Sequence, residues 1–253
     1  MKFLRKTAEC VFIAAFGLLL WIIIASIASN ELIFPSPFLV FSRLFVLAGK
    51  VVFWQSLGMS LLRVVVGVIL ALLLSIVLAG FAARFKTVRH FLYPFNEIIK
   101  ATPVVSFIFI AYIIFTKNIG LLPVFIVMLI VFPVSYGSLL NSLLNVDHML
   151  IEVADVFGAT PIEKLRYLWI PTSLSSFASS GSTALGLGWK AGIAAEALAS
   201  TPSLLGIGSE ISNAKIYIET VDQFAWTFVI IVLSILIELL FSFLMNRLKN
   251  KLL

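Results

Sequence analysis

The sequence from Asp147 to Pro171 reads DHMLIEVADVFGATPIEKLRYLWIP and separates two long apolar stretches. Its first part has the spacing of a short helix of roughly Met149 to Phe157. Gly158 follows directly, and glycine readily takes the left-handed conformation that closes a helix. The pattern therefore predicts a helix that ends at Gly158.

A second helix is predicted to begin immediately after this turn. Thr160 is a suitable N-cap, and Pro161 stands at the first helical position, where its missing N–H costs nothing. Glu163 lies three residues after the cap and completes a capping box. Pro171 is expected to mark the next break. The whole stretch predicts a rigid, polar helical hairpin directly before an apolar segment.

The amino-acid composition of the whole chain is that of a membrane protein. Of the 253 residues, 61% are hydrophobic and 12% are charged, against roughly 45–50% and roughly 25% in soluble domains. Such a chain suits a helical bundle whose outer surface faces lipid, because every backbone polar group is then satisfied inside a helix. The same figures exclude disorder, a coiled coil and a disulfide scaffold. The fold class is therefore all-α, in the membrane.

The uncharged intervals predict six membrane-spanning helices, since about 20 apolar residues cross a bilayer. They are Cys10–Ser29, Val64–Ala83, Ala101–Thr116, one span within residues 118–146 that Gly120 and Pro123 begin, one within Tyr167–Trp189, and Phe224 to about Met245. The first follows basic residues and could be a secretion signal. Its apolar run of about 18 residues exceeds the roughly 7–15 of a cleaved signal, so we expect an uncleaved helix.

The basic residues indicate that both termini lie in the cytoplasm. With this orientation the inner segments hold Lys2, Arg5, Lys6, Arg84, Lys86, Arg89, Lys100, Lys164, Arg166, Arg247, Lys249 and Lys251, which are 12 of the 18. The outer segments hold Arg43, Lys50, Arg63, Lys117, Lys190 and Lys215. This distribution follows the positive-inside rule. The net charge of +6 is then a sign of topology, and no nucleic-acid partner is expected.

The hairpin resembles the EAA signature of the membrane subunits of ATP-binding-cassette (ABC) importers. The matching residues are Glu152, Ala154, Gly158, Ile170 and Pro171; the chain departs from the signature with Val153 and Asp155 at the two alanine positions. The resemblance covers roughly residues 34–238. It includes Pro35-Ser36-Pro37, Ser60-Leu61-Leu62-Arg63, Ala101-Thr102-Pro103 and the stretch from Trp189 to Glu196, which look like the permeases of the nitrate, sulfonate and taurine importer group.

This resemblance implies a type I ABC importer permease fold, a single transmembrane domain over residues 1–253 in the inner membrane. It also implies a homodimer, cytoplasmic ATP-binding subunits and an extracytoplasmic solute-binding protein as partners. The expected solute is small, such as nitrate, a sulfonate, taurine or a thiamine precursor. In residues 147–171, the expected ATPase-coupling residues are Glu152, Ala154, Asp155, Gly158, Thr160, Pro161, Glu163, Ile170 and Pro171.

Small residues recur at four-residue spacing in the fifth predicted span, at Ser180, Ala184 and Gly188. Small residues let helices approach closely, so this stripe either lines the solute pathway near a dimer axis or packs inside one subunit. The resemblance favours the pathway. Trp189 and Glu196 belong to the same candidate pathway or gate. Lys190 and Glu196 flank the outer end of this span and are expected to mark a water-facing end, with an ion pair between them or a position at the solute entrance as the alternatives.

Two further groups of charges suggest roles. Glu238 interrupts the sixth predicted span and is expected to reach the interface or an ion partner, with a proton relay as the alternative. Glu210, Glu219 and Asp222 make the segment after the fifth span the most acidic outer region. This region either receives a binding protein or is simply a solvated loop.

The sequence contains no catalytic constellation. His90 and His148 begin no metal-binding pair, and no Gly-Lys-Ser/Thr phosphate loop occurs. We therefore expect no metal, no cofactor and no enzymatic activity, with ATP hydrolysis supplied by a partner chain. The alternatives are an ion-gradient-coupled secondary transporter and an intramembrane enzyme. The former usually shows an inverted repeat with ionisable residues at mid-membrane, and the latter a cluster of titratable groups within the spans.

Overall fold

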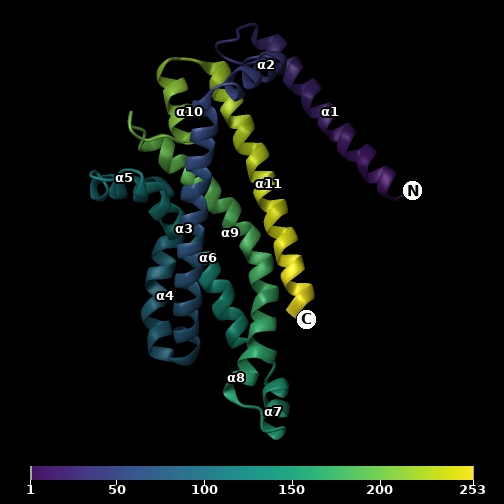
Figure 1. Ribbon diagram of the computed structural model, residues 1–253, viewed down its shortest axis with the longest axis vertical. Coiled ribbons are helices and arrows are strands. Elements are labelled where there is room, and N and C mark those ends of the chain that lie inside the picture. The colour runs from purple at the N-terminus through teal and green to yellow at the C-terminus, as the bar shows by residue number, and fades with distance from the viewer. Residues whose placement is uncertain (1, 253) are drawn as a thin grey trace.

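The computed structural model describes residues 2–252, which form a helical bundle without any strand (Figure 1). The side chains of residues 2–11, 14, 174–176, 178–179 and 248–252 lie outside the described set, as do the predictions that rest on Cys10 and on the basic side chains near the two termini. The helices are α1 (Lys2–Ala28), α2 (Pro37–Ala48), α3 (Val51–Arg84), α4 (Lys86–Ala101), α5 (Val104–Ile114), α6 (Leu121–Leu144), α7 (His148–Val156), α8 (Pro161–Lys164), α9 (Ile170–Leu198), α10 (Ile207–Ile216) and α11 (Thr220–Leu252).

Helix α6 lies at the centre of the bundle, packed between α3 and α9. Glycines set the close approach of these helices. A Cβ on Gly67 of α3 would lie 2.7 Å from Val127 Cβ of α6, and a Cβ on Gly188 of α9 would lie 2.6 Å from Val131 Cγ2. Such contacts leave no room for a larger side chain, so the small residues of α3 and α9 bring their backbones against α6.

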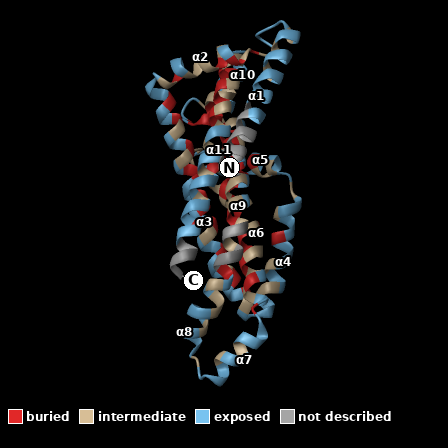
Figure 2. Cartoon of the chain, turned by 90° about the vertical axis from the view of Figure 1, so that its right-hand side faces the viewer, coloured by how far each residue is buried: buried red, intermediate tan, exposed pale blue. Residues whose placement is uncertain are grey.

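The bundle has two different ends. At one end α2 and α10 pack beside the first turns of α11, and at the other α7 and α8 project beyond the long helices (Figure 1). Buried residues gather along the middle of the bundle, whereas α7 and α8 are almost entirely exposed (Figure 2). The hairpin is therefore held by the chain at its two ends and by little else.

Three of the predicted spans correspond to single long apolar helices. Among the described residues, α3, α6 and Thr220–Arg247 of α11 are long and apolar enough to cross a membrane. The first and fifth predicted spans fall in α1 and α9, whose side chains are described only in part. Their membrane crossing stays a prediction.

The prediction of Ala101–Thr116 as one continuous span is wrong. This stretch holds only the short helix α5, which meets α4 at a bend of 104°. Thr102 leaves the helical conformation (φ −84°, ψ 131°) because the proline ring that follows it excludes the helical geometry. Together α4 and α5 form one broken apolar segment, so the basic inner segment before Ala101 is helical rather than a simple connection between two spans.

Helix limits also differ from the spans that the charges outlined. Helix α3 begins at Val51, so Arg63 lies inside it, and α9 continues to Leu198, so Lys190 and Glu196 lie within the helix rather than beyond its end. Pro171 does not break the chain either; it stands in the first turn of α9, after a π-helical turn at Leu165–Trp169. A charge ends the lipid-facing part of a helix without ending its backbone hydrogen bonds.

Candidate functional site

The first half of the hairpin has the helix ends that its sequence predicts. The Asp147 carboxylate accepts a hydrogen bond from the Met149 N–H at 2.9 Å and caps α7. Gly158 has φ +69°. Its N–H donates to the Asp155 carbonyl (3.0 Å), and the Ala159 N–H donates to the Ala154 carbonyl (2.9 Å). These two bonds are those of a Schellman turn, which satisfies the last carbonyls of α7.

The second half begins with the predicted capping box. The Thr160 N–H donates to Glu163 Oε2 (2.7 Å), while the Glu163 N–H donates to Thr160 Oγ1 (3.3 Å). The hydrogen bonds from the Thr160 backbone and hydroxyl lower the pKa of the Glu163 carboxyl below its usual value. An ion pair between Lys164 and Asp155 joins the two halves. The hairpin is therefore rigid through its own bonds.

The hairpin exposes apolar side chains that nothing in this chain covers. Val156 and Phe157 are each 85% exposed, Ile162 is 76% exposed and Met149 72%. An exposed apolar cluster on a rigid projection is typical of a surface that docks into a partner. Among the predicted coupling residues, Glu152 and Asp155 are exposed as well, and Ala154 is half-buried.

The hairpin is joined to α9 without a flexible link. The π-helical turn at Leu165–Trp169 continues from α8, and the Ile170 N–H that follows it donates to the Leu165 carbonyl. Ile170 and Pro171 then form the first turn of α9. Helical hydrogen bonds therefore run without interruption from α8 into the first turn of α9. π-Helical turns occur frequently at functional sites.

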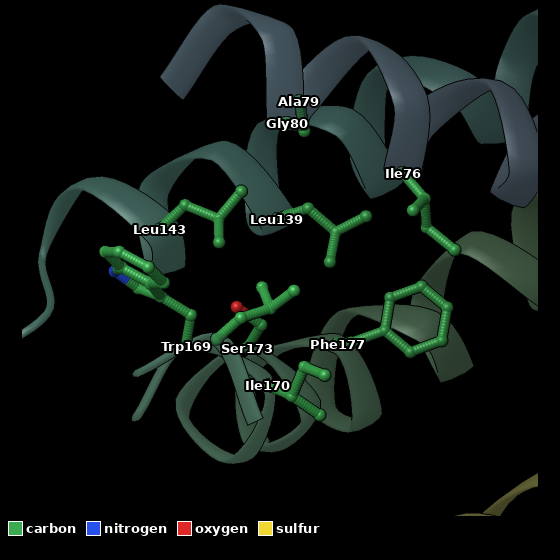
Figure 3. A pocket seen from close by; sticks show the side chains of 10 residues that line it. Ile76, Ala79, Gly80, Leu139, Leu143, Trp169, Ile170, Ser173 and Phe177 are labelled. Carbon is green, nitrogen blue, oxygen red and sulfur yellow. The ribbon is translucent and has the colours of Figure 1, made fainter. Parts of the chain in front are cut away.

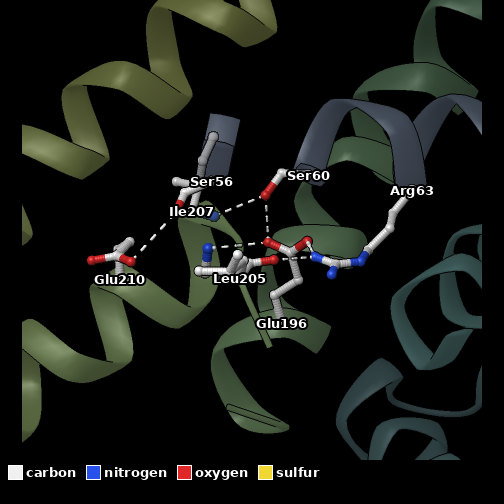
Figure 4. A network of polar contacts seen from close by, with 8 residues as sticks. Ser56, Ser60, Arg63, Glu196, Leu205, Ile207 and Glu210 are labelled. Atoms are coloured by element: carbon white, nitrogen blue, oxygen red, sulfur yellow. Dashed lines mark hydrogen bonds and ion pairs between the residues drawn. The ribbon is translucent and has the colours of Figure 1, made fainter. Parts of the chain in front are cut away.

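A buried ion pair lies toward the opposite end of the same helix (Figure 4). Arg63 of α3 is 5% exposed and Glu196 of α9 is 1% exposed, and Arg63 Nη1 donates to Glu196 Oε1 at 2.7 Å. The same nitrogen donates to the Leu205 carbonyl at 2.5 Å. Glu196 therefore pairs with Arg63 and not with Lys190, which is exposed. Arg63 and Glu196 are 133 residues apart in sequence, but α3 and α9 pack side by side and bring the two side chains together. The prediction that Glu196 marks a water-facing end is wrong, because its carboxylate is buried between helices.

Further hydrogen bonds complete this network. Ser60 Oγ donates to Glu196 Oε2 (2.6 Å) and accepts from the Ile207 N–H (2.8 Å), while the Gly208 N–H donates to Glu196 Oε2 (3.2 Å). A side chain on Gly208 would overlap the Ile193 carbonyl oxygen. Glu196 thus connects α3, α9 and the start of α10, and its burial is compensated by several donors.

The other predicted pathway residues lie mainly within the packing of one chain. Ala184 and Trp189 are each 1% exposed, and the Trp189 indole N–H donates to the Ile230 carbonyl of α11 (3.3 Å). Gly188 contacts α6, as described above, and Ser180 is half-buried. Their part in a pathway therefore stays a prediction about the assembled transporter. Arg63 and Ser60 were not selected as site residues from the sequence, because only their position in space reveals the pairing.

The acidic outer region is helical and folds over a polar cavity of about 280 Å³. Arg43 of α2 forms two hydrogen bonds with the Asp222 carboxylate of α11, at 2.5 and 2.9 Å, and this partner raises the pKa of the guanidinium. Glu210 of α10 accepts from Ser56 Oγ at 3.3 Å. Burial raises the pKa of the Glu210 carboxyl, and the nearby Asp222 charge adds to this effect.

Glu238 lies on the side of α11 that faces α9, where a Cβ on Gly186 would be 3.0 Å from its Oε1. The carboxylate is exposed in the single chain. Among the described side chains, no group of three or more His, Cys, Asp or Glu residues could hold a metal ion.

Comparisons with known proteins agree with this architecture. The family model of the binding-protein-dependent transport system inner membrane component matches residues 71–253. The taurine transport system permease protein TauC of Escherichia coli (strain K12) is 28% identical over 87% of this chain and 80% of its own length. A probable ABC transporter permease protein of Haemophilus influenzae (strain ATCC 51907 / DSM 11121 / KW20 / Rd) is 24% identical over 91% of this chain and 92% of its own.

Two solved structures have a similar fold. One is an amino acid ABC transporter crystallised with histidines, with a TM-score of 0.60 and 15% identity over 83% of this chain and 95% of that one. The other is the MetNI methionine ABC transporter in inward facing conformations, with a TM-score of 0.54 and 20% identity over 79% of this chain and 94% of that one.

Proposed function

The chain belongs to the family of binding-protein-dependent transport system inner membrane components, and from this premise we propose that two copies of it carry a small solute inward, driven by partner ATPase subunits. The chain is a multi-pass plasma-membrane protein and a permease subunit of an ABC importer, with a role in the translocation pathway. Coupling and assembly are inferred from the geometry of the hairpin and of the exposed helix faces, and the solute is inferred from the relative named as a taurine transport permease.

The observation that carries the proposal is the rigid, uncovered hairpin of α7 and α8. Its caps, its Schellman turn and the Lys164–Asp155 ion pair hold its shape. Its apolar side chains, led by Val156 and Phe157, are available for a partner's groove. When two ATPase subunits close on ATP, a stiff hairpin passes their rigid-body motion to α9 through the π-helical turn, whereas a flexible loop would absorb it.

A second copy of the chain is proposed to cover the face shared by α9 and α11. Glu238 is exposed there beside Gly186, and α11 is mostly exposed along its apolar length. A carboxylate at this depth is costly against lipid. It is accommodated if the face borders a water-filled pathway or a neighbouring subunit, which agrees with a pathway near a dimer axis.

The proposed solute is a small sulfonate or a similarly small polar anion or zwitterion, delivered by an extracytoplasmic binding protein. This proposal rests on the relative named as a taurine transport permease, which matches most of this chain. The outer end of the bundle, with α2, α10 and the start of α11, is the surface proposed to receive the binding protein.

The test is uptake of radiolabelled taurine into proteoliposomes that contain the chain with its ATPase subunit and binding protein. We expect uptake that requires internal ATP and is unaffected by collapse of ion gradients. A tenfold excess of unlabelled sulfonate should compete, whereas methionine should not. Uptake by the chain alone, driven by an ion gradient, would instead establish a secondary transporter.

A further inference from the structure

An apolar cavity of about 420 Å³ lies near the hairpin end of the bundle (Figure 3). Its walls come from three parts of the chain: α3, the end of α6, and the π-helical turn with the first turns of α9. The lining residues are Ile76, Ala79, Gly80, Leu139, Leu143, Leu165, Trp169, Ile170, Ser173 and Phe177. The cavity is therefore an elongated slot between helices of one chain, almost wholly lined by hydrocarbon.

One polar side chain belongs to the lining of this slot. Ser173 is drawn among the lining side chains in Figure 3, but the residue is only 8% exposed and its hydroxyl oxygen is buried. The slot thus has room for an apolar chain and exposes almost no polar surface to it.

Two arginines follow lining residues along the chain at the hairpin end of the slot. Ile76 and Gly80 line the cavity from one face of α3, and Arg84 follows at the same four-residue spacing in the last turn of that helix. On the other wall, Arg166 is adjacent to the lining residue Leu165. Both arginines belong to the segments that the positive-inside rule places in the cytoplasm. Basic residues at the cytoplasmic mouth of a gap between helices attract anionic lipid headgroups.

We propose that this slot binds one acyl chain of an anionic phospholipid of the inner leaflet, with its phosphate at Arg84 and Arg166. The acyl chain fills the apolar volume of the slot. The lipid then packs against the π-helical turn that joins the hairpin to α9. This binding site is separate from the solute pathway and does not depend on which solute is carried.

The experiment is fluorescence quenching of Trp169 by lipids with brominated acyl chains. The purified full-length chain is placed in vesicles of phosphatidylcholine with a fixed fraction of either brominated phosphatidylglycerol or brominated phosphatidylcholine. The contribution of Trp169 is obtained by subtracting the signal of the Trp169→Phe variant. We expect an apparent affinity for the anionic lipid about thirtyfold higher than for the neutral one, because each of the two arginines near the surface contributes about 1 kcal/mol, or about fivefold.

Two variants separate the slot from the general lipid surface. A Cβ on Gly80 meets no atom within 4 Å, so Gly80→Leu fills the slot without a clash; Gly58→Leu, in the same helix and equally open, is the matched control. Quenching of Trp169 should fall to the bulk-lipid level in Gly80→Leu and be unchanged in Gly58→Leu. Arg84→Gln, at the exposed end of α3, should keep the quenching but lose most of the preference for phosphatidylglycerol.

Equal quenching in wild type and Gly80→Leu would overturn the proposal, because bulk lipid or a neighbouring protein surface would then account for the signal. Equal quenching by the two lipids in wild type would overturn the assignment of an anionic headgroup. Arg84→Gln tests the same assignment even where Gly80→Leu does not fold.

Discussion

At the residue scale, Gly158 is the position on which the hairpin turn depends. Its φ of +69° is a conformation that L side chains rarely adopt, although a Cβ there would meet no atom within 4 Å. Gly158→Ala should therefore destabilise the turn by about 1 kcal/mol through backbone strain alone. Gly158→Pro should be worse, because it cannot reach this φ and loses the bond to the Asp155 carbonyl.

We expect Gly158→Pro to abolish ATPase stimulation by the permease and solute uptake in vesicles while the chain still inserts in the membrane. Gly158→Asn is the matched control, since asparagine tolerates the left-handed region and should keep most of the coupling. Normal uptake by the proline variant would show that the turn plays no part in coupling.

Glu210 gives a pH prediction at the same scale. Its pKa is raised in the folded protein, so between its ordinary value and the raised value the folded state binds more protons than the unfolded state. The stability that this carboxyl contributes is present at acid pH, below its ordinary pKa of about 4.3, and is lost as the pH rises through the raised pKa. Glu210→Gln should remove this loss. Melting temperatures of wild type and variant, measured in detergent from pH 4 to 8, should diverge in favour of the variant as the pH rises.

The helix ends of the hairpin could be predicted from sequence because caps and turns depend on residues within a few positions. Thr160, Glu163 and Gly158 form the predicted bonds and conformation. The partner of Glu196 could not be predicted this way. Lys190 is nearer in sequence, but Arg63 is nearer in space, and that proximity depends on how α3 and α9 pack.

At the element scale, the Arg63–Glu196 pair should matter most when one partner alone is removed. Glu196→Leu leaves a buried guanidinium that still donates to the Leu205 carbonyl but has lost its carboxylate partner, and breaking a buried pair in this way costs about 3–5 kcal/mol. We expect a large fall in melting temperature in detergent. The double variant Arg63→Met/Glu196→Leu should recover much of it. A double variant less stable than either single variant would show that the charges themselves hold α3 and α9 together.

The close approach of α10 to α9 gives a second prediction at this scale. A Cβ on Gly208 would overlap the backbone oxygen of Ile193, which cannot move aside as a flexible side chain could. Gly208→Ala should therefore lower the melting temperature, whereas Gly58→Ala, where a Cβ meets nothing within 4 Å, should leave it the same or higher. Equal stability of the two variants would contradict the packing described for α10.

Charge intervals predicted most of the long helices but not their limits. The helices of Arg63 and Glu196 continue through these charges because a charged side chain does not interrupt backbone hydrogen bonds, and the Arg63–Glu196 ion pair compensates the two charges where they are buried. The broken segment of α4 and α5 was missed because α4 is amphipathic, with charged and apolar residues on different faces. A count of uncharged residues does not detect such a helix.

At the scale of the whole molecule, one long helical path connects the two ends of the bundle. The hairpin continues through the π-helical turn into α9, which ends beside the buried network and α10. A movement imposed on the hairpin is therefore transmitted along α9 toward the outer surface. This arrangement supports a permease in which ATPase closure at one end changes access at the other.

The claim that the hairpin couples ATP hydrolysis to transport is tested most directly by solute uptake into proteoliposomes. These hold the chain, its ATPase subunit and the binding protein, and wild type and Gly158→Pro are compared at equal insertion. We expect ATP-dependent uptake by wild type that persists when ion gradients are collapsed, and loss of that uptake in Gly158→Pro. Uptake that the permease performs without ATPase or ATP, or that the hairpin variant retains in full, would contradict this claim.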